Sequence, residues 1–180
     1  MDTAAILEAL TPLVPGAVFE PAPSVDFPAL YVPADRLTEA CRALADAAPL
    51  RFDLLVELTA VDYLPREPRY EVVYHLVSIP NRTRLRLKVR VAAGAALPTV
   101  QGIWPAAGWP EREVYDLFGI VFEGHPDLRR ILMAEDWEGH PLRKDYPVQI
   151  RKTAQTYEPL EVTEQEFRAN LERDRVVRKQ

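Results

Sequence analysis

The stretch RTRLRLKVRVAA, residues 82–93, constrains the fold more than any other part of the sequence, because apolar and basic side chains alternate along it. A strand has a period of two, so one set of side chains faces a packed layer and the other faces water. The two sets are the apolar Leu85, Leu87, Val89 and Val91, and the basic Arg84, Arg86, Lys88 and Arg90. The alternation predicts a half-buried strand in a sheet that is covered on one face only.

Two further strands are predicted just before it, in RFDLLVELTAVDY at 51–63 and in RYEVVYHLVSI at 69–79. Both stretches are rich in β-branched and aromatic residues, which favour strands. Residues 64–68 supply a turn between them, and Pro80-Asn81 supplies a turn before the alternating strand. The three strands are therefore expected to form an antiparallel meander.

Helices are predicted at 3–10 and at 34–48, where apolar residues recur at helical spacing. Six prolines between Pro12 and Pro33 exclude a long helix there, and a short strand is expected at 29–32. The fold class that follows is α+β: a mainly antiparallel sheet of about four strands with helices packed on one face.

The basic row of the alternating strand allows two interpretations. Arg84, Arg86, Lys88 and Arg90 could form a patch for an anion or a partner, or they could be a solvated strand face. Glu57 and Glu71 on the neighbouring strands are candidate ion-pair partners, and we favour the solvated face.

Composition excludes several classes of protein. The net charge of −5 argues against a general nucleic-acid binder. The single cysteine, Cys41, excludes an intrachain disulfide framework and a four-cysteine cluster, and its helical position predicts a buried structural thiol. The three histidines lack metal-site spacing, and we expect neither a signal peptide nor a membrane span.

The segment EREVYDLFGIVFEGHPDLRRIL, residues 111–132, is the densest in chemistry-bearing side chains. A short helix is expected in LPTVQGIW, then a Pro/Gly break, then a helix that begins at Pro110 and ends at Gly119. The helical wheel places Arg112 and Asp116 together on the face opposite the core, where they could pair. No Ser, Cys or Thr lies near enough in sequence to suggest a nucleophile.

A Gly-His-Pro tripeptide occurs twice, at 124–126 and at 139–141, each followed by two basic residues. The two copies predict similar turns with a basic residue near a carboxylate, Asp127 in the first and Asp145 in the second. The alternative is a pair of docking turns for a partner. A weaker alternative pairs Glu113 with His125 as a base and its orienting group.

Composition changes beyond Leu132, because only sixteen of the last forty-eight residues are apolar. Such a stretch cannot bury enough surface to order itself alone, although Trp137, Tyr146 and Tyr157 could fill pockets on a partner. A Thr163–Glu166 capping box predicts a terminal helix with a thin stripe of Phe167, Leu171 and Val176. We therefore expect a core domain at 1–132 and an extended partner-binding arm at 133–180.

The segment 111–132, together with EGHPLRKDYP at 138–147, strongly resembles the signature of the thirty-kDa (C) subunits of respiratory complex I. The strand pattern upstream is also similar, so the resemblance spans residues 50–150. The positions that match the signature are Glu111, Arg112, Glu113, Asp116, His125, Asp127, Arg129, Arg130, His140, Arg143, Lys144 and Tyr146.

The resemblance implies a scaffolding subunit of the hydrophilic arm of proton-translocating NADH:quinone oxidoreductase. It implies no catalytic, metal or cofactor site on this chain, with FMN and iron–sulfur clusters on partner subunits. The partners implied are the D subunit, which helps to form the quinone site, and neighbouring subunits of the arm. The implied location is the cytoplasmic face of the cell membrane, as a peripheral part of a complex, and the matching positions are implied to specify the fold and subunit contacts.

Two other functions stay open from the sequence. A homologous subunit serves in related membrane-bound hydrogenases and other donor:quinone oxidoreductases, and the signature does not identify the electron donor. A freestanding hydrolase that uses His125 and a carboxylate is the alternative of a different class. It predicts turnover by the isolated chain.

Overall fold

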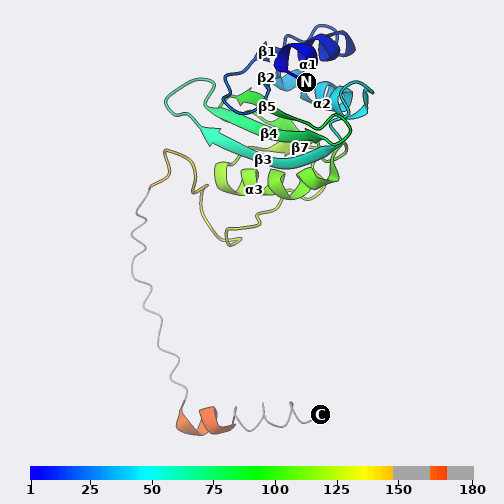
Figure 1. Cartoon of the computed structure of the whole chain (residues 1–180). Coiled ribbons are helices and arrows are strands. Elements are labelled where there is room, and N and C mark those ends of the chain that lie inside the picture. Colours follow the sequence, from blue (N-terminus) through cyan, green and yellow to red (C-terminus); the bar gives the residue numbers. More distant parts are fainter. Residues whose placement is uncertain (148–162, 170–180) are drawn as a thin grey trace, which may run out of the picture. The chain divides into compact units, whose positions relative to one another are not determined.

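The computed structural model describes residues 1–147 and 163–169. The chain divides into two compact units, Met1–Pro147 and Val148–Gln180. Within the first unit, Figure 1 shows strands β5, β4 and β3 side by side, with α1 and α2 near β1 and β2 and with α3 beside β3.

A five-stranded sheet forms the centre of the first unit, in the order β1-β2-β5-β4-β3. The elements are β1 (Glu20–Pro21), β2 (Ala29–Tyr31), β3 (Leu54–Asp62), β4 (Tyr70–Ser78) and β5 (Thr83–Val91). The β3, β4 and β5 strands form the predicted antiparallel meander, while β2 pairs with β5 in parallel. The mainly antiparallel α+β fold is confirmed.

Three α-helices accompany the sheet in the described part of the first unit: α1 (Thr3–Leu10), α2 (Leu37–Asp46) and α3 (Gly108–Phe118). The 3₁₀ turns η1 (Thr11–Leu13), η2 (Ala34–Arg36) and η3 (Pro105–Ala107) each run directly into or out of one of these helices. The stretch expected as a short helix before Pro105 instead begins with β6 (Leu97–Pro98), which pairs in parallel with β7 (Phe122–Glu123).

The core lies on one face of the sheet. Leu85, Leu87 and Val89 of β5 are each at most 1% exposed, so the apolar set of the alternating strand is buried as predicted. Tyr74 of β4 is fully buried on this covered face, and burial raises the pKa of its phenol well above the ordinary value. Cys41 is fully buried, in agreement with a structural thiol.

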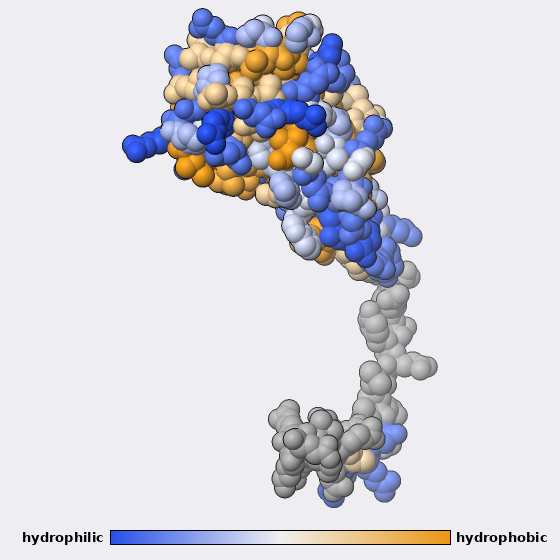
Figure 2. Space-filling view, turned by 90° about the vertical axis from the view of Figure 1, so that its right-hand side faces the viewer, coloured by the Kyte–Doolittle hydropathy of each residue, from blue (hydrophilic) through white to orange (hydrophobic). Residues whose placement is uncertain are grey.

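The other face of the sheet carries the basic row, and no helix of the described residues covers it. Three of its four cations have carboxylate partners: Arg86 with Asp26, Lys88 with Glu71, and Arg90 with Glu20. Glu71 is a partner as expected, but the N-terminal carboxylates Asp26 and Glu20 take the place expected for Glu57. Figure 2 shows apolar and hydrophilic residues in separate patches on one side of the molecule.

Residues 133–147 belong to the first unit, although the sequence placed them in the arm. Buried carboxylates of the core hold this segment, because Asp116 accepts the backbone N–H of Met133 and Asp62 accepts that of Lys144. The polar composition of the segment hid these anchors.

In the second unit, residues 164–169 are helical. The hydroxyl of Thr163 accepts the N–H of Glu166, and the carboxylate of Glu166 accepts the N–H of Thr163, so the predicted capping box is confirmed. Tyr157, Leu171 and Val176 lie outside the described residues. No helix in the described part of the chain is long and apolar enough to cross a membrane.

Candidate functional site

Helix α3 is the element around which the signature residues gather. Because η3 runs directly into it, α3 begins at Gly108, before the predicted start at Pro110. Pro110 and Glu111 occupy the first turn, and Gly119 ends the helix in the left-handed region with φ of 75°. Proline is tolerated in the first turn because its missing N–H would have no partner within the helix, and an acid in this turn and glycine at the end are favoured. Local chemistry therefore supports this position of the helix.

Asp116 is fully buried, which corrects the expectation that it lies on the face opposite the core. Its carboxylate accepts the N–H groups of Ile131, Leu132 and Met133 at 3.0, 2.8 and 2.8 Å, and Nη1 of Arg130 at 2.8 Å. Burial alone would raise the pKa of Asp116, but the four donors outweigh it and lower the pKa. A carboxylate offers about four acceptor sites, so the carboxylate of Asp116 is saturated.

The expected ion pair between Arg112 and Asp116 is wrong. Arg112 instead donates to the carbonyl oxygens of Arg129 and Arg130, at 3.0 and 3.1 Å. Its Nη1 lies 3.9 Å from the carboxylate of Asp127, which pairs with Arg129 at 2.6 Å. Both residues thus hold the loop after α3: Arg112 binds carbonyl oxygens of the loop, and Asp116 binds its N–H groups.

Glu111 is also fully buried, near the other end of the helix. Its carboxylate accepts the backbone N–H of Val100 at 2.8 Å and the hydroxyl of Thr99. Burial raises the pKa of Glu111, and these two hydrogen bonds oppose the rise only in part. Glu111 thereby ties α3 to the turn that follows β6.

His125, in the first Gly-His-Pro turn, lies 3.9 Å from Glu111. Its Nε2 is 3.0 Å from the carbonyl oxygen of Gly108, and its Nδ1 accepts the N–H of Asp127 at 3.0 Å. Both ring nitrogens are therefore engaged within the chain, with the proton on Nε2. Glu113, the carboxylate that the sequence suggested as a catalytic partner of His125, is exposed; the nearby carboxylate is that of Glu111.

The second Gly-His-Pro turn caps the C-terminal end of α3. The last carbonyl groups of a helix lack partners within it, and cations are favoured near them. Here three carbonyl oxygens have donors at 2.9, 3.0 and 2.6 Å, in the pairs Asp116 with His140 Nδ1, Leu117 with Leu142 N–H, and Phe118 with Arg143 Nε. The two tripeptides thus contact opposite ends of α3, the first at Gly108 and the second at the last carbonyl groups.

Gly119 makes this cap possible. A Cβ atom at this position would lie 2.5 Å from Cδ2 of His140 and 2.6 Å from Nη2 of Arg143. Its φ of 75° also disfavours any side chain. Gly139 similarly leaves space for the ring of Tyr146, whose hydroxyl donates to the carbonyl oxygen of Glu138.

The sequence did not indicate that Arg69 and Asp62 belong to this site. Arg69, 7% exposed, bridges two carboxylates: it donates to Asp62 at 3.0 and 2.7 Å and to Asp145 at 2.9 and 2.8 Å. Hydrogen bonds from Arg69 are the main cause that lowers the pKa of both Asp62 and Asp145. Asp145 thus pairs with an arginine of the sheet and not with its basic neighbours Arg143 and Lys144. The available signal was an acid and a base on the two sides of one hairpin turn.

The signature side chains therefore build a framework between the sheet, α3 and the loops after it. Around this framework three large apolar side chains face outward: Trp109 is 64% exposed, Leu132 60% and Leu142 49%. The guanidinium of Arg112 lies 5.1 Å from the ring centre of Trp109. Exposed apolar residues on a rigid support are typical of protein contact surfaces. In the described residues no three His, Cys, Asp or Glu side chains gather as a metal site would require.

The fold and this framework define a class of small α+β protein whose signature residues hold the loops of the same chain. The three exposed apolar side chains around the framework, Trp109, Leu132 and Leu142, are called the α3 rim below. Residues 30–152 match the family of the respiratory-chain NADH dehydrogenase, 30 Kd subunit. The chain belongs to this family, as the resemblance of the signature indicated.

Curated relatives agree with this assignment. The chain is 48% identical over 158 residues to the NADH-quinone oxidoreductase C subunit of Roseiflexus sp. (strain RS-1), covering 87% of this chain and 91% of the relative. It is 59% identical over 101 residues to the corresponding C subunit of Geotalea uraniireducens (strain Rf4), covering 56% of this chain and 62% of that relative.

Two solved structures are similar. One is the trypsin-resistant fragment (1-134) of Nqo5, with a TM-score of 0.52 and 38% identity, covering 63% of this chain and 90% of that fragment. The other is a chain of the membrane-bound sulfane sulfur reductase, an archaeal respiratory membrane complex, with a TM-score of 0.65 and 33% identity, covering 81% of this chain and 83% of that one.

Proposed function

We propose that this chain is a non-catalytic scaffolding subunit of the hydrophilic arm of a proton-translocating NADH:quinone oxidoreductase. It docks on the D subunit, which helps to form the quinone site, and supports electron transfer from NADH to quinone. Flavin and iron–sulfur clusters belong to its neighbours, and the complex holds the chain at the cytoplasmic face of the cell membrane. Family membership supports the assembly, and the names of the curated relatives support the donor and the acceptor.

One observation supports the scaffolding role most strongly: the buried signature residues make their hydrogen bonds to other groups of the same chain. Asp116 accepts four hydrogen bonds, and both ring nitrogens of His125 are occupied. A catalytic acid or base needs a donor or acceptor that is available to hydrogen-bond a substrate. The outward-facing Trp109, Leu132 and Leu142 are what the site offers to another molecule, and this rim fits a protein neighbour.

The second candidate is the corresponding subunit of a related membrane-bound complex with another electron donor or acceptor. The likeness to a chain of the sulfane sulfur reductase favours it, because that likeness extends over four fifths of both chains. The chain's fold and framework serve either assembly equally, so only the neighbours distinguish the two.

Affinity purification of the tagged full chain from gently solubilised native membranes tests both candidates. We expect co-purification of cluster-bearing subunits and the quinone-site D subunit, a visible iron–sulfur spectrum and NADH:quinone activity. The same neighbours without an NADH-oxidising subunit would favour the second candidate. A colourless chain with no neighbours would contradict both, and turnover by that isolated chain would support the hydrolase.

A further inference from the structure

The uncovered face of the sheet is the second large surface of the first unit. It extends over β2, β5, β4 and β3, which at the usual strand spacing is about 14 Å across, and along nine-residue strands about 30 Å long. These dimensions give a projected area of about 420 Å². A typical protein contact buries roughly 800 Å² on each partner, so such a contact would cover the whole face and extend onto its rims. It lies on the side of the sheet opposite α3.

One end of this face is apolar. Leu54 is 42% exposed, Val56 60% and Ile79 64%, and all three lie at or just beyond the ends of β3 and β4 that are beside each other. The register of β3 shifts between Leu55 and Glu57, which leaves Val56 as the extra residue of a bulge. Bulges re-aim side chains, and this one exposes an aliphatic group on the edge strand. Three such neighbours make a patch typical of interaction sites.

A hollow of about 290 Å³ adjoins the apolar patch. Its lining includes Phe27, Val56, Glu57, Val77 and Arg84. Its volume lies at the lower limit of small-molecule pockets, which usually span about 300 to 1,000 Å³, and it is large enough to receive one or two side chains of a partner.

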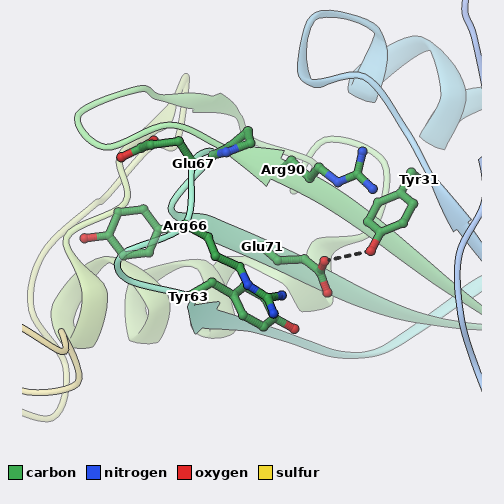
Figure 3. A pocket seen from close by; sticks show the side chains of 8 residues that line it. Tyr31, Tyr63, Arg66, Glu67, Glu71 and Arg90 are labelled. Atoms are coloured by element: carbon green, nitrogen blue, oxygen red, sulfur yellow. Dashed lines mark hydrogen bonds between the residues drawn. The ribbon is translucent and has the colours of Figure 1, made fainter.

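The opposite end of the face is aromatic and charged. Figure 3 shows the hollow there, in which the hydroxyl of Tyr31 donates to the carboxylate of Glu71 at 3.1 Å. The hollow measures about 220 Å³, and Tyr63, Arg66 and Arg90 also line it. Tyr and Arg are among the residues that contribute most often to the binding energy of protein contacts.

Some cations on this face have carboxylate partners within the chain, and others do not. Three cations of the basic row, Arg86, Lys88 and Arg90, pair with carboxylates of the chain. Arg84 and Arg66 stack on Phe27 and Tyr63, at 5.2 and 5.7 Å from the ring centres, and no carboxylate of the described residues pairs with either. A partner that covers them must bring carboxylates, because a buried unpaired guanidinium is costly.

We propose that the uncovered sheet face binds a second neighbouring subunit, a protein whose contact surface carries apolar side chains flanked by carboxylates. The apolar side chains fill the patch and hollow around Val56, and the carboxylates meet Arg84 and Arg66. The chain then lies between two neighbours, one on the α3 rim and one on the opposite side of the sheet. The proposal rests on the proposed function only in that the chain works within an assembly.

Thiol labelling tests this surface directly, because the one native cysteine is not expected to react with the label. Cys41 is fully buried and burial raises the pKa of its thiol, so both access and the reactive thiolate are lacking. We would compare Val56→Cys and Ile79→Cys on the sheet face with Leu132→Cys on the α3 rim. Val18→Cys is the matched control, an exposed valine in the loop before β1.

Each variant is labelled with a maleimide as the isolated full chain and in the purified complex, and the labelled chain is quantified by mass. We expect labelling at positions 56 and 79 to slow at least about tenfold on assembly, with position 18 unchanged, because a covered thiol cannot be attacked. Unchanged rates at 56 and 79 would overturn the proposal, and so would equal slowing at position 18.

The rim position separates this proposal from the proposed function. Protection at 132 with free labelling at 56 and 79 leaves the docking of the rim intact and removes the second contact. Free labelling at 132 with protection at 56 and 79 does the reverse.

The identity of the occupant follows from a photo-crosslinker attached to the Val56→Cys variant in the complex. A crosslink to an Asp- or Glu-containing peptide of another subunit is the expected result. A crosslink to a second copy of this chain, or to lipid, would overturn the choice of occupant. Arg84→Glu should also lower the amount of chain retained in the complex, while Arg42→Glu, an exposed charge reversal on α2, should not.

Discussion

Replacement of Asp116 by alanine is expected to lower the free energy of unfolding of the isolated chain by about 3 to 5 kcal/mol, because it breaks a buried, fully bonded ion pair. Three backbone N–H groups lose their acceptor and the guanidinium of Arg130 loses its carboxylate. Urea unfolding followed by circular dichroism measures the change.

Glu113→Ala is the matched control for this variant, since Glu113 is an exposed acid on the same helix. We expect it to change the free energy of unfolding by no more than about 0.5 kcal/mol. A loss below about 1 kcal/mol for Asp116→Ala would show that the loop after α3 does not depend on this carboxylate.

Replacement of Arg69 by methionine is expected to lower the free energy of unfolding by about 3 to 5 kcal/mol at neutral pH. Methionine keeps much of the volume but leaves Asp62, whose side chain is fully buried, without its guanidinium. Asp145 contributes less to this loss, because half of its side chain is exposed and solvent screens the pair. Arg42→Met, at an exposed position, is the control.

The same variant should weaken the acid sensitivity of the fold. Hydrogen bonds from Arg69 lower the pKa of Asp62 and Asp145, and the four donors described above lower that of Asp116 despite its burial. For such groups the stabilisation is present above the ordinary pKa of about 4 and is lost as the pH falls through the lower folded value. Glu111 acts in the opposite sense, because burial raises its pKa and its contribution is lost as the pH rises through the folded value.

Three aspartates outweigh one glutamate, so the unsubstituted chain should lose stability between about pH 5 and pH 3, and the Arg69→Met variant should lose less over that interval. Urea unfolding at both pH values gives the two differences. An equal or larger loss in Arg69→Met would contradict the assignment of the lowered pKa values to Arg69.

The sequence predicts the sheet well because its signal is local. The alternation at 82–93 fixes which side of β5 is buried, and turn residues fix the order of β3, β4 and β5. The capping residues of α3 are equally local, so Gly119 is found where it was expected. In each case neighbours in the chain decide the conformation.

The bonding of the charged residues was predicted poorly because its partners are distant in sequence. A helical wheel pairs Arg112 with Asp116, but tertiary contacts bury Asp116 against residues 130–133 and turn Arg112 toward other carbonyls. Arg69 and Asp145 are 76 positions apart, and no local pattern links them. For the same reason a polar stretch at 133–147 seemed free of the core.

If the signature residues build a docking framework and perform no chemistry, His125→Ala should impair assembly of the complex without impairing its turnover. We would measure both the amount of complex assembled and its NADH:quinone turnover per assembled complex. We expect less complex, with turnover per complex within about twofold of the unsubstituted value. Normal assembly with turnover reduced about a hundredfold or more, the usual effect of removing an acid–base group, would contradict the claim.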